Sequence, residues 1–599
     1  MRRGARAHPV RRPIRSVQRG ALAAVPTELP PATGGVPTAG ASARALLVAR
    51  AGHLRAALAT VAGQRRLAWA LTCLLIALDC FIIGQRALVT HWAYHSQAFD
   101  LGNMDQAVWN TLHGQPFRFT NRGIDWYGPP TRLGIHVEPI LFLIAPLYLI
   151  HSGAETLIVL QTVALALGAL PLLALALRRL PDVPLLGVVF VVAYLATPEI
   201  LGEALWGFHP VTLATPLLLA AIFALDLRRY GWFLLAGVLA AMTKEDVALA
   251  LVPLGLLIAV SHRRPRLGIA VMVGSVAWTA LCFLVIIPHF NGGASAAGNA
   301  FWYRYTQLGN SPGAAIRNLL LHPWLLVPVI VTPGKLAYLG LLLLTGGALG
   351  LFAPFWWLAA LPELAINLLS AQVPQYSGFY QYNAIILPVA LAAAVYGVAA
   401  WRAARASVLA GEPGDDLAME RAATPNGWPR AVLAYARRVR RWWRRLIGRI
   451  PLAPRRIAPL VAVWLLVATA INLVIIQPKL SGFWQAGAGP APHQAQIAAL
   501  LARIPPTALV AATDTLDPHL TDRVTIYLMP DPLSYQAEYV AADLATAAAP
   551  AKAGDAVMLQ AMLASGHYRV LGKVDAVIVL RRTGPPLTPP PAPASSPIP

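Results

Sequence analysis

The sequence predicts a mainly α-helical protein that crosses a membrane many times and carries a small α/β domain near its C-terminus. Of its 599 residues, 57% are hydrophobic and only 12% are charged, about half the charged share of an average soluble domain. Apolar stretches of membrane-spanning length recur between Leu67 and Ile476. Beyond them, short β-prone and helix-like stretches alternate. This combination excludes a soluble globular enzyme and a disordered protein.

Eleven apolar stretches are expected to span the membrane. They cover residues 67–89, 156–178, 183–200, 210–227, 231–244, 246–261, 267–288, 336–352, 354–370, 384–401 and 457–477. Two other apolar stretches, His136–Ile150 and His322–Thr332, are interpreted as re-entrant or juxtamembrane helices. The first is about 15 residues long and contains two prolines, and a crossing there would move Arg178 and Arg179 to the other side.

The net charge of +22 first suggests a nucleic-acid-binding protein, but its distribution indicates membrane topology instead. With eleven spans and a cytoplasmic N-terminus, 32 of the 48 Lys and Arg residues fall in cytoplasmic segments. This asymmetry follows the positive-inside rule. We therefore expect a multi-pass plasma-membrane protein with its C-terminal domain outside and with no nucleic-acid partner.

The chain divides into a series of predicted regions. These are a disordered basic cytoplasmic tail (1–66), a transmembrane core (67–401) with an outer-face loop (90–155), a basic cytoplasmic insert (402–456), a last transmembrane helix (457–477), an outer-face α/β domain (480–582) and a Pro-rich disordered tail (583–599). In the insert, Arg437–Arg449 interleaves Trp with Arg, which suits either an interfacial helix on anionic lipid or a simple positive-inside loop.

The α/β domain is predicted from the alternation of β-prone runs with helix-like stretches. The expected strands are Leu509–Ala512, Val524–Leu528, Tyr568–Leu571 and Ala576–Leu580, and the expected helices are Gln494–Arg503 and Ala556–Ala564. No Gly-rich phosphate loop accompanies them, so no nucleotide site is predicted. The three cysteines lie in apolar segments and indicate neither a disulfide framework nor a zinc site.

Acids, histidines and one lysine gather at the predicted outer face of the membrane. The candidates are Asp100, Asp105, His136, Glu138, His209, Lys244, Glu245 and Asp246. Charged groups at membrane depth are costly and usually face a cavity or a partner. Plainer interpretations exist, because Lys244–Asp246 could be a hydrated turn, Asp100 a helix N-cap, and each histidine an interfacial group. Their convergence on one face favours a functional site.

These residue types suit chemistry on a lipid-linked phosphate. A carboxylate can take a proton from an acceptor hydroxyl as a general base, and Lys or Arg can hold a phosphate leaving group. Histidines and carboxylates could also hold a divalent cation, but their spacing matches no strong metal motif, so metal ligands stay unassigned. No other cofactor is indicated.

Six motifs carry a family resemblance. They are FDLGNMDQAVWNTLHGQ (99–115), HVEPILFLIAPLYLI (136–150), LWGFHP (205–210), TKEDVAL (243–249), LPELAINLLS (361–370) and LVAATDTLDPHLTDRVTIYLMP (509–530). Together they resemble a prokaryotic family of predicted polytopic membrane proteins classed as a domain of unknown function, over about 67–582. More distantly, Asp100 and His136–Pro139 resemble the first-loop acid and the Pro-containing loop-helix motif of GT-C glycosyltransferases, which use polyprenyl-phosphate sugars at the outer membrane face.

The distant resemblance implies a membrane glycosyltransferase. Its partners would be membrane lipids, a polyprenyl-phosphate sugar donor and an envelope glycan, lipid or protein acceptor. Asp100, Asp105 and Glu138 are the candidate bases. Lys244 resembles a lysine that often ends a short outer-facing helix in such enzymes, and Arg304 is a second phosphate-binding candidate. The pocket would be shaped, or a cation held, by His136, Glu138, His209, Glu245 and Asp246.

Two other function classes remain open. A transporter or flippase usually places ionisable groups near the midplane and shows repeated halves, whereas here the groups line one face and no repeat is evident. A non-catalytic envelope-assembly protein would bind lipid or polymer, and would tolerate neutral substitutions near Asp100 and Lys244.

Overall fold

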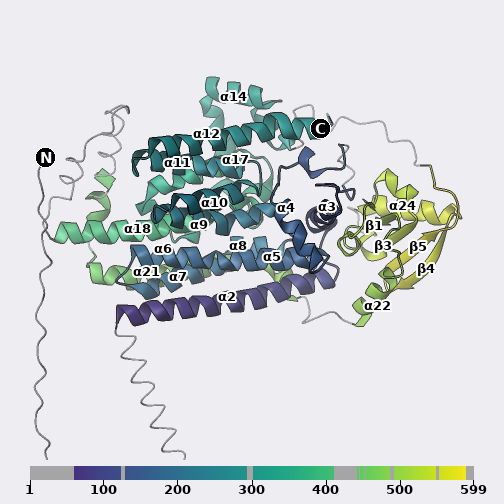
Figure 1. The fold of residues 1–599 in the computed structure, drawn as a ribbon, viewed down its shortest axis with the longest axis horizontal. Helices are drawn as coiled ribbons and strands as arrows, with labels where there is room; N and C mark the ends of the chain where they lie inside the picture. The colour runs from purple at the N-terminus through teal and green to yellow at the C-terminus, as the bar shows by residue number, and fades with distance from the viewer. Residues whose placement is uncertain are drawn as a thin grey trace, which may run out of the picture. The chain divides into compact units, whose positions relative to one another are not determined.

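The computed structural model describes most of the chain (Figure 1). The described residues are 60–122, 128–292, 301–410, 442–443, 445–450, 452–485, 492–547 and 552–588. Most of the predicted basic tail (1–59), most of the predicted basic insert (411–441) and the end of the predicted Pro-rich tail (589–599) lie outside them. The predictions for those segments stay predictions.

Helices dominate the described chain up to Gln485, and five of them are long and apolar enough to cross a membrane. They are α2 (Val61–Trp92), α5 with α6 (Ala154–Leu167 and Ala169–Arg179), α12 with its continuation to α13 (Pro265–Leu281 and Ile287–Phe290), α18 (Ile386–Leu409) and α21 (Pro454–Gln485). The mainly helical membrane fold expected from the hydropathy is confirmed.

Further apolar helices are broken or short. The bent pairs are α7 with α8 (Pro184–Leu195 and Pro198–Leu205, 47°) and η7–α14 with η8–α15 (Trp302–Leu321 and Pro323–Ile330, 105°). The shorter elements are η4–α9 (Pro210–Leu213, Ala214–Asp226), α10 (Tyr230–Ala241), η5–α11 (Val247–Ala250, Leu251–Val260), α16 (Pro333–Thr345), η9 (Leu349–Phe352), η10 (Pro354–Ala359) and α17 (Leu361–Leu369). Each predicted span coincides with one or more of these helices, and the number of crossings stays a prediction.

The two faces of α2 show how these helices partition between protein and membrane. Leu74, Leu78 and Phe81 leave 54%, 45% and 71% of their surface exposed, which suits contact with lipid. Ala68 and Ala87 on the other side are buried where α2 packs against α5 and α7. Helix packing in membranes relies on such close van der Waals contact at small residues.

Helix α18 is the most buried of the five long apolar helices, and it contacts α6, α9, η9 and η10. Its alanine-rich run 390–394 is fully buried. Gly397 is required for the closest contact, because a Cβ there would lie 2.0 Å from the carbonyl oxygen of Leu349. Small residues therefore let the neighbouring helices approach this helix closely.

The first loop, residues 93–153, holds short helices. They are η1 (Ala98–Gly102), α3 (Asn103–Leu112), η2 (Arg132–Gly134), α4 (Leu141–Ile144) and η3 (Ala145–Leu149). The stretch His136–Ile150 thus folds as two short helices, too short for a crossing, and its re-entrant or juxtamembrane position stays a prediction.

The C-terminal domain is a five-stranded sheet of order β2-β1-β3-β5-β4. Its strands are β1 (Val510–Ala512), β2 (Ile526–Leu528), β3 (Tyr539–Asp543), β4 (Tyr568–Val574) and β5 (Val577–Arg582). Strands β2, β1 and β3 run parallel, and β5 pairs antiparallel with both β3 and β4. The expected small α/β domain is confirmed, but β3, at the centre of the sheet, was not among the predicted strands.

One helix packs on each face of this sheet. Residues of α22 (Pro492–Leu501) share one apolar cluster with Val510, Ala512 and Val579. Residues of α24 (Ala553–Ala564) share the other with Ala511 and Leu580. The two clusters take alternate residues of the same strands, because successive side chains of a strand point to opposite faces.

Candidate functional site

The start of the first loop is fixed by the C-terminal domain, more than 390 residues further along the chain. The backbone N–H of Ala98 donates to the Asp514 carboxylate (N···Oδ1 2.9 Å). Asn121 Nδ2 donates to Asp517 Oδ1 over 2.7 Å. Gly102 packs so closely here that a Cβ would lie 2.2 Å from the same Asp517 oxygen. These contacts set the position of η1, a single π-helical turn.

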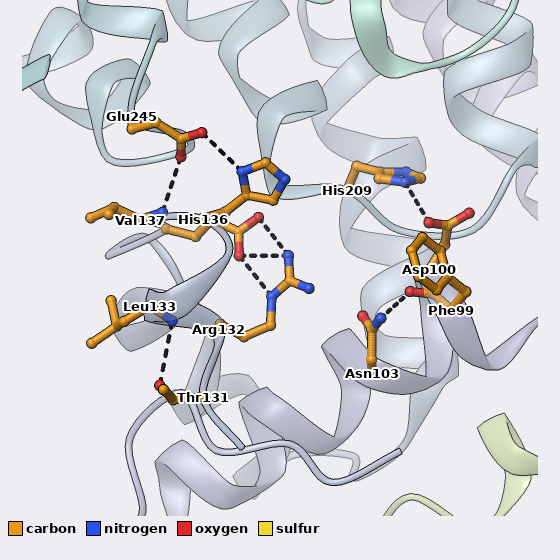
Figure 2. A network of polar contacts seen from close by, with 11 residues as sticks. Phe99, Asp100, Asn103, Thr131, Arg132, Leu133, His136, Val137, His209 and Glu245 are labelled. Carbon is orange, nitrogen blue, oxygen red and sulfur yellow. Dashed lines mark hydrogen bonds and ion pairs between the residues drawn. The ribbon is translucent and has the colours of Figure 1, made fainter. Parts of the chain in front are cut away.

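Asp100 lies in η1 and pairs with His209, which precedes η4 (Nε2···Oδ1 3.1 Å; Figure 2). The Asp100 side chain is 22% exposed, and no hydrogen bond in the described part of the chain engages its Oδ2. Gln161 positions His209, since its Oε1 accepts from the His209 backbone N–H (3.0 Å) while its Nε2 donates to the Glu203 and Gly207 carbonyls. The result is a partly open carboxylate beside an imidazole whose backbone is held by Gln161.

His136 and Glu245 form a second histidine–carboxylate pair (Nδ1···Oε1 2.9 Å; Figure 2). The other oxygen of Glu245 accepts from the backbone N–H of Val137 at 3.0 Å. Although burial alone would raise it, the charges of His136 and Lys244 and these hydrogen bonds lower the pKa of Glu245 to about 2. Glu245 therefore stays ionised and ties the first loop to the turn between α10 and η5.

Arg132 and Glu138 form a buried, two-point ion pair within the first loop (Figure 2). The Arg132 Nε and NH2 groups donate to the two Glu138 oxygens at 3.0 and 3.1 Å. Their side chains are only 6% and 4% exposed. Because both Glu138 oxygens are occupied by the guanidinium, this carboxylate is positioned to stabilise the loop rather than to accept a proton from a substrate.

Lys244 and Asp246 pair in the turn that follows α10 (Nζ···Oδ2 2.6 Å). The Lys244 side chain is 18% exposed and the Asp246 side chain 5%. Glu245 and Glu363 of α17 add further negative charge close to the ammonium. The predicted triplet thus forms one buried charged cluster rather than a hydrated turn, and Lys244 is paired within it.

Arg304, in η7, joins this region through aromatic contacts. Its guanidinium carbon lies 4.2 Å from the ring centroid of Phe301 and 5.8 Å from that of Tyr382. Phe301 in turn stacks on His136, with ring centroids 5.2 Å apart. Phe301 therefore links Arg304 to the His136–Glu245 pair, and the phosphate-binding role of Arg304 stays a prediction.

The segment 379–382 links the Arg304 region to Asp100. Tyr380 packs edge-on against Trp206, with ring centroids 5.2 Å apart. Burial, followed by the charges of Asp100 and Tyr382, raises the pKa of the Tyr380 hydroxyl. The two histidine–carboxylate pairs, Lys244 and Arg304 thus belong to one connected region of loops at this end of the helices.

Asp105 is not open to a substrate. Its side chain is buried under the C-terminal domain and contacts the hydroxyls of Tyr148 and Thr521. Burial and the nearby Asp522 raise the pKa of Asp105 well above its ordinary value of 3.8. Because both oxygens face protein hydroxyls, this candidate base is positioned as a docking group between the first loop and the C-terminal domain.

Several residues of the region were absent from the predicted site. They are Arg132, Gln161, Glu363, Tyr380 and Tyr382. Glu363 carried a usable signal, because a carboxylate inside an apolar stretch is costly in a membrane. Among the described residues, no group of three or more His, Cys, Asp and Glu is arranged to hold a metal ion, and the divalent cation stays a prediction.

The fold and the site define a polytopic membrane protein whose polar loops meet a C-terminal α/β domain. The family profile described as "Predicted membrane protein (DUF2079)" matches residues 90–579, and the chain belongs to this family. The family resemblance expected from the motifs is therefore confirmed. None of the curated proteins matches the sequence.

Two crystal structures of ArnT from Cupriavidus metallidurans are similar to the chain. The structure bound to undecaprenyl phosphate has a TM-score of 0.45 and 15% sequence identity, and the match covers 85% of this chain and 97% of that one. For the apo state the TM-score is 0.44 and the identity 14%, with the same coverage. A likeness at this level carries no argument about chemistry.

Proposed function

We propose that the protein is a GT-C-like glycosyltransferase that transfers a sugar from a polyprenyl-phosphate carrier at the outer face of the membrane. The observation that carries the proposal is the partly open Asp100 carboxylate, paired with His209, in the same region as two cations, Lys244 and Arg304. A transferase of this kind needs a base for the acceptor and positive charge for the departing phosphate.

In the proposed reaction, Asp100 accepts the proton of an acceptor hydroxyl through Oδ2 while His209 holds Oδ1. The acceptor oxygen forms a bond to the anomeric carbon of the sugar, and the bond from that carbon to the phosphate oxygen breaks. Its electron pair leaves with the polyprenyl phosphate, whose charge Lys244 and Arg304 neutralise. Attack from the side opposite the leaving group inverts the configuration.

The other candidates support this arrangement. Glu245 holds His136 and the start of the 136–150 segment, and Arg132 and Glu138 fix the loop beneath it. Asp246 holds Lys244 in place until a phosphate competes for it. Asp100 is the preferred base because Glu138 is fully paired and Asp105 is enclosed.

The positive-inside distribution of Arg supports the outer-face placement. The Arg-rich ends of α6 and α9 lie at the far ends of these helices from the first loop, and cytoplasmic loops favour Lys and Arg. The C-terminal domain is the proposed place for acceptor binding because it holds η1 in position.

The test uses the purified full-length protein in proteoliposomes with a radiolabelled polyprenyl-phosphate hexose and an envelope extract as acceptor source. Asp100→Asn should keep binding of polyprenyl phosphate but lower sugar transfer by about 100-fold or more, as expected for loss of a general base. Lys244→Gln should weaken polyprenyl-phosphate binding by about tenfold, the scale of one charged hydrogen bond.

The matched control is Lys573→Gln, an exposed lysine on β4, which should leave both readouts unchanged. Wild-type transfer by Asp100→Asn would refute the assignment of the base. Equal binding by Lys244→Gln and Lys573→Gln would refute the phosphate site. Accumulation of substrate inside the vesicles without release of polyprenyl phosphate would instead identify a transporter.

A further inference from the structure

Two arginines converge on one buried carboxylate at the ends of α6 and α9 that lie away from the candidate site. Asp226, whose side chain is fully buried, accepts from Arg178 Nε at 2.7 Å and from Arg179 Nε at 2.6 Å. Tyr396 of α18 donates its hydroxyl to the same carboxylate at 2.6 Å. The two guanidinium groups are thus held in place while their side chains stay 50% and 42% exposed.

This arrangement leaves donor groups pointing away from the carboxylate. Arg178 uses only Nε, and its two terminal amino groups make no hydrogen bond within the described part of the chain. A guanidinium with two free terminal groups can bind a phosphate with two parallel hydrogen bonds. Since one Asp226 charge faces two arginine charges, the cluster keeps a positive charge.

Further cations lie close by. Burial and the charges of Arg228 and Arg179 lower the pKa of His262. Arg264 lies over the ring of Tyr230, 4.7 Å from its centroid, and Tyr230 shares a hydrogen bond of 3.2 Å with His262. The surface around Asp226 is therefore basic and aromatic, a composition suited to an anionic headgroup.

A small apolar hollow of about 60 Å³, here called the groove, lies near this basic cluster. It is lined only by apolar side chains and aromatic rings, from α11 and η10: Pro253, Leu254, Leu257, Phe355, Trp356 and Ala359. Trp356 stacks on Tyr396 with ring centroids 4.2 Å apart, and Arg179 lies 4.8 Å from the centroid of that Tyr396 ring. One aromatic pair therefore connects the groove to the arginines.

We propose that this place is a binding site for an anionic phospholipid, separate from the proposed transferase site. The phosphate binds Arg178 and Arg179, which Asp226 and Tyr396 hold in position, and a few methylene groups of one acyl chain fill the groove along Trp356 and Leu257. Anionic lipid is the occupant because the cluster is cationic, and a zwitterionic headgroup brings a positive choline against it. The site does not depend on the reaction proposed above.

The experiment measures lipid retention by native mass spectrometry of the full-length protein in detergent, with dioleoyl phosphatidylglycerol or dioleoyl phosphatidylcholine added. Wild-type protein should retain phosphatidylglycerol preferentially. Arg178→Gln should lower that retention about fivefold, the effect of one basic residue near anionic lipid. Arg178→Lys keeps the charge but loses the forked guanidinium, so its retention of phosphatidylglycerol should lie between those of the wild type and Arg178→Gln. Leu257→Trp, which fills the groove, should also lower retention.

The matched control is Arg65→Gln, which removes one exposed arginine from the same end of the helices, near the start of α2, and should leave retention unchanged. Equal retention by Arg178→Gln and Arg65→Gln would overturn the headgroup site. Wild-type retention by Leu257→Trp, or full displacement of lipid by inorganic phosphate, would overturn the acyl-chain groove. Equal retention of phosphatidylcholine would refute the preference for anionic lipid.

Discussion

His91, near the end of α2, stacks face to face on His519 of the C-terminal domain, with ring centroids 4.1 Å apart and an interplanar angle of 14°. The ring of Tyr94 also packs on the ring of His519, with centroids 4.3 Å apart. Together with the contacts of the first loop, this stack makes the C-terminal domain part of the surface that positions Asp100. The end of the chain therefore shapes a site whose polar residues come from its first half.

His519 should make this docking sensitive to acid. Burial and the neighbouring His91 lower the pKa of His519 well below its ordinary 6.5. A histidine with a depressed folded-state pKa contributes stability that is present above pH 6.5 and is lost as the pH falls towards the folded value. His519→Phe keeps an aromatic ring but removes the titrating imidazole. The unfolding temperature of this variant should therefore fall less steeply than that of the wild type on the acid side of a plot against pH. His493→Phe, at an exposed histidine of α22, should leave the acid limb in place. An unchanged acid limb in His519→Phe would contradict the prediction.

Asp105 should have the opposite effect on the pH dependence of stability, which it should lower as the pH rises. Its folded-state pKa is raised, so the stability it contributes is fully present below pH 3.8 and is lost as the pH rises through the folded value. Asp105→Asn keeps a polar side chain of the same shape but does not titrate, so its unfolding temperature should fall less than that of the wild type as the pH rises above 3.8. Asp575→Asn, at an exposed turn between β4 and β5, is the control and should follow the wild type. Parallel curves for all three proteins would refute the prediction.

Gly102 should tolerate no side chain. A Cβ at this position would lie 2.2 Å from Asp517 Oδ1 and 3.3 Å from Asn121 Nδ2, so Gly102→Ala must move the Asp517 side chain away from Asn121 and weaken the contact that docks the domain. Forcing extra atoms into a packed contact costs roughly 1–3 kcal/mol. Limited proteolysis should release the C-terminal domain faster, and the unfolding temperature should drop. The control is Gly231→Ala in α10, where a Cβ meets nothing within 4 Å; a Gly102→Ala protein as resistant as this control would argue against the contact.

The sequence was sufficient for features that depend on local composition. Apolar stretches become helices because their backbone groups must be satisfied internally in a membrane, and the predicted strands at β1, β2, β4 and β5 are confirmed. Strand β3 was missed because Tyr539–Asp543 is short, contains two alanines and leads into an alanine-rich run typical of helix. Its place between β1 and β5, which no local pattern reveals, makes it a strand.

The candidate site, too, was predictable only where the local sequence carried a signal. Asp100, His209 and Lys244 were identifiable because charged groups beside apolar segments are unusual. Their partners depend on long-range contacts, such as Ala98 with Asp514, which a single sequence does not reveal. For the same reason Asp105 resembled a free acid in sequence, whereas folding places it beneath the C-terminal domain.

Breaking the buried pair of Arg132 and Glu138 should destabilise the protein strongly, whereas replacing both residues should destabilise it much less. Removing one partner leaves an uncompensated buried charge, so Arg132→Leu or Glu138→Leu alone should each destabilise the protein by about 3–5 kcal/mol. The double variant should recover much of this loss, because it buries no unpaired charge. The comparison pair is Arg402 with Asp182, whose carboxylate side chain is 61% exposed; breaking it should cost at most about 1 kcal/mol. Denaturant unfolding of the four single variants and of the Arg132–Glu138 double variant measures these differences. Additive losses in that double variant would show that the pair is not coupled and would remove it from the framework that holds the first loop.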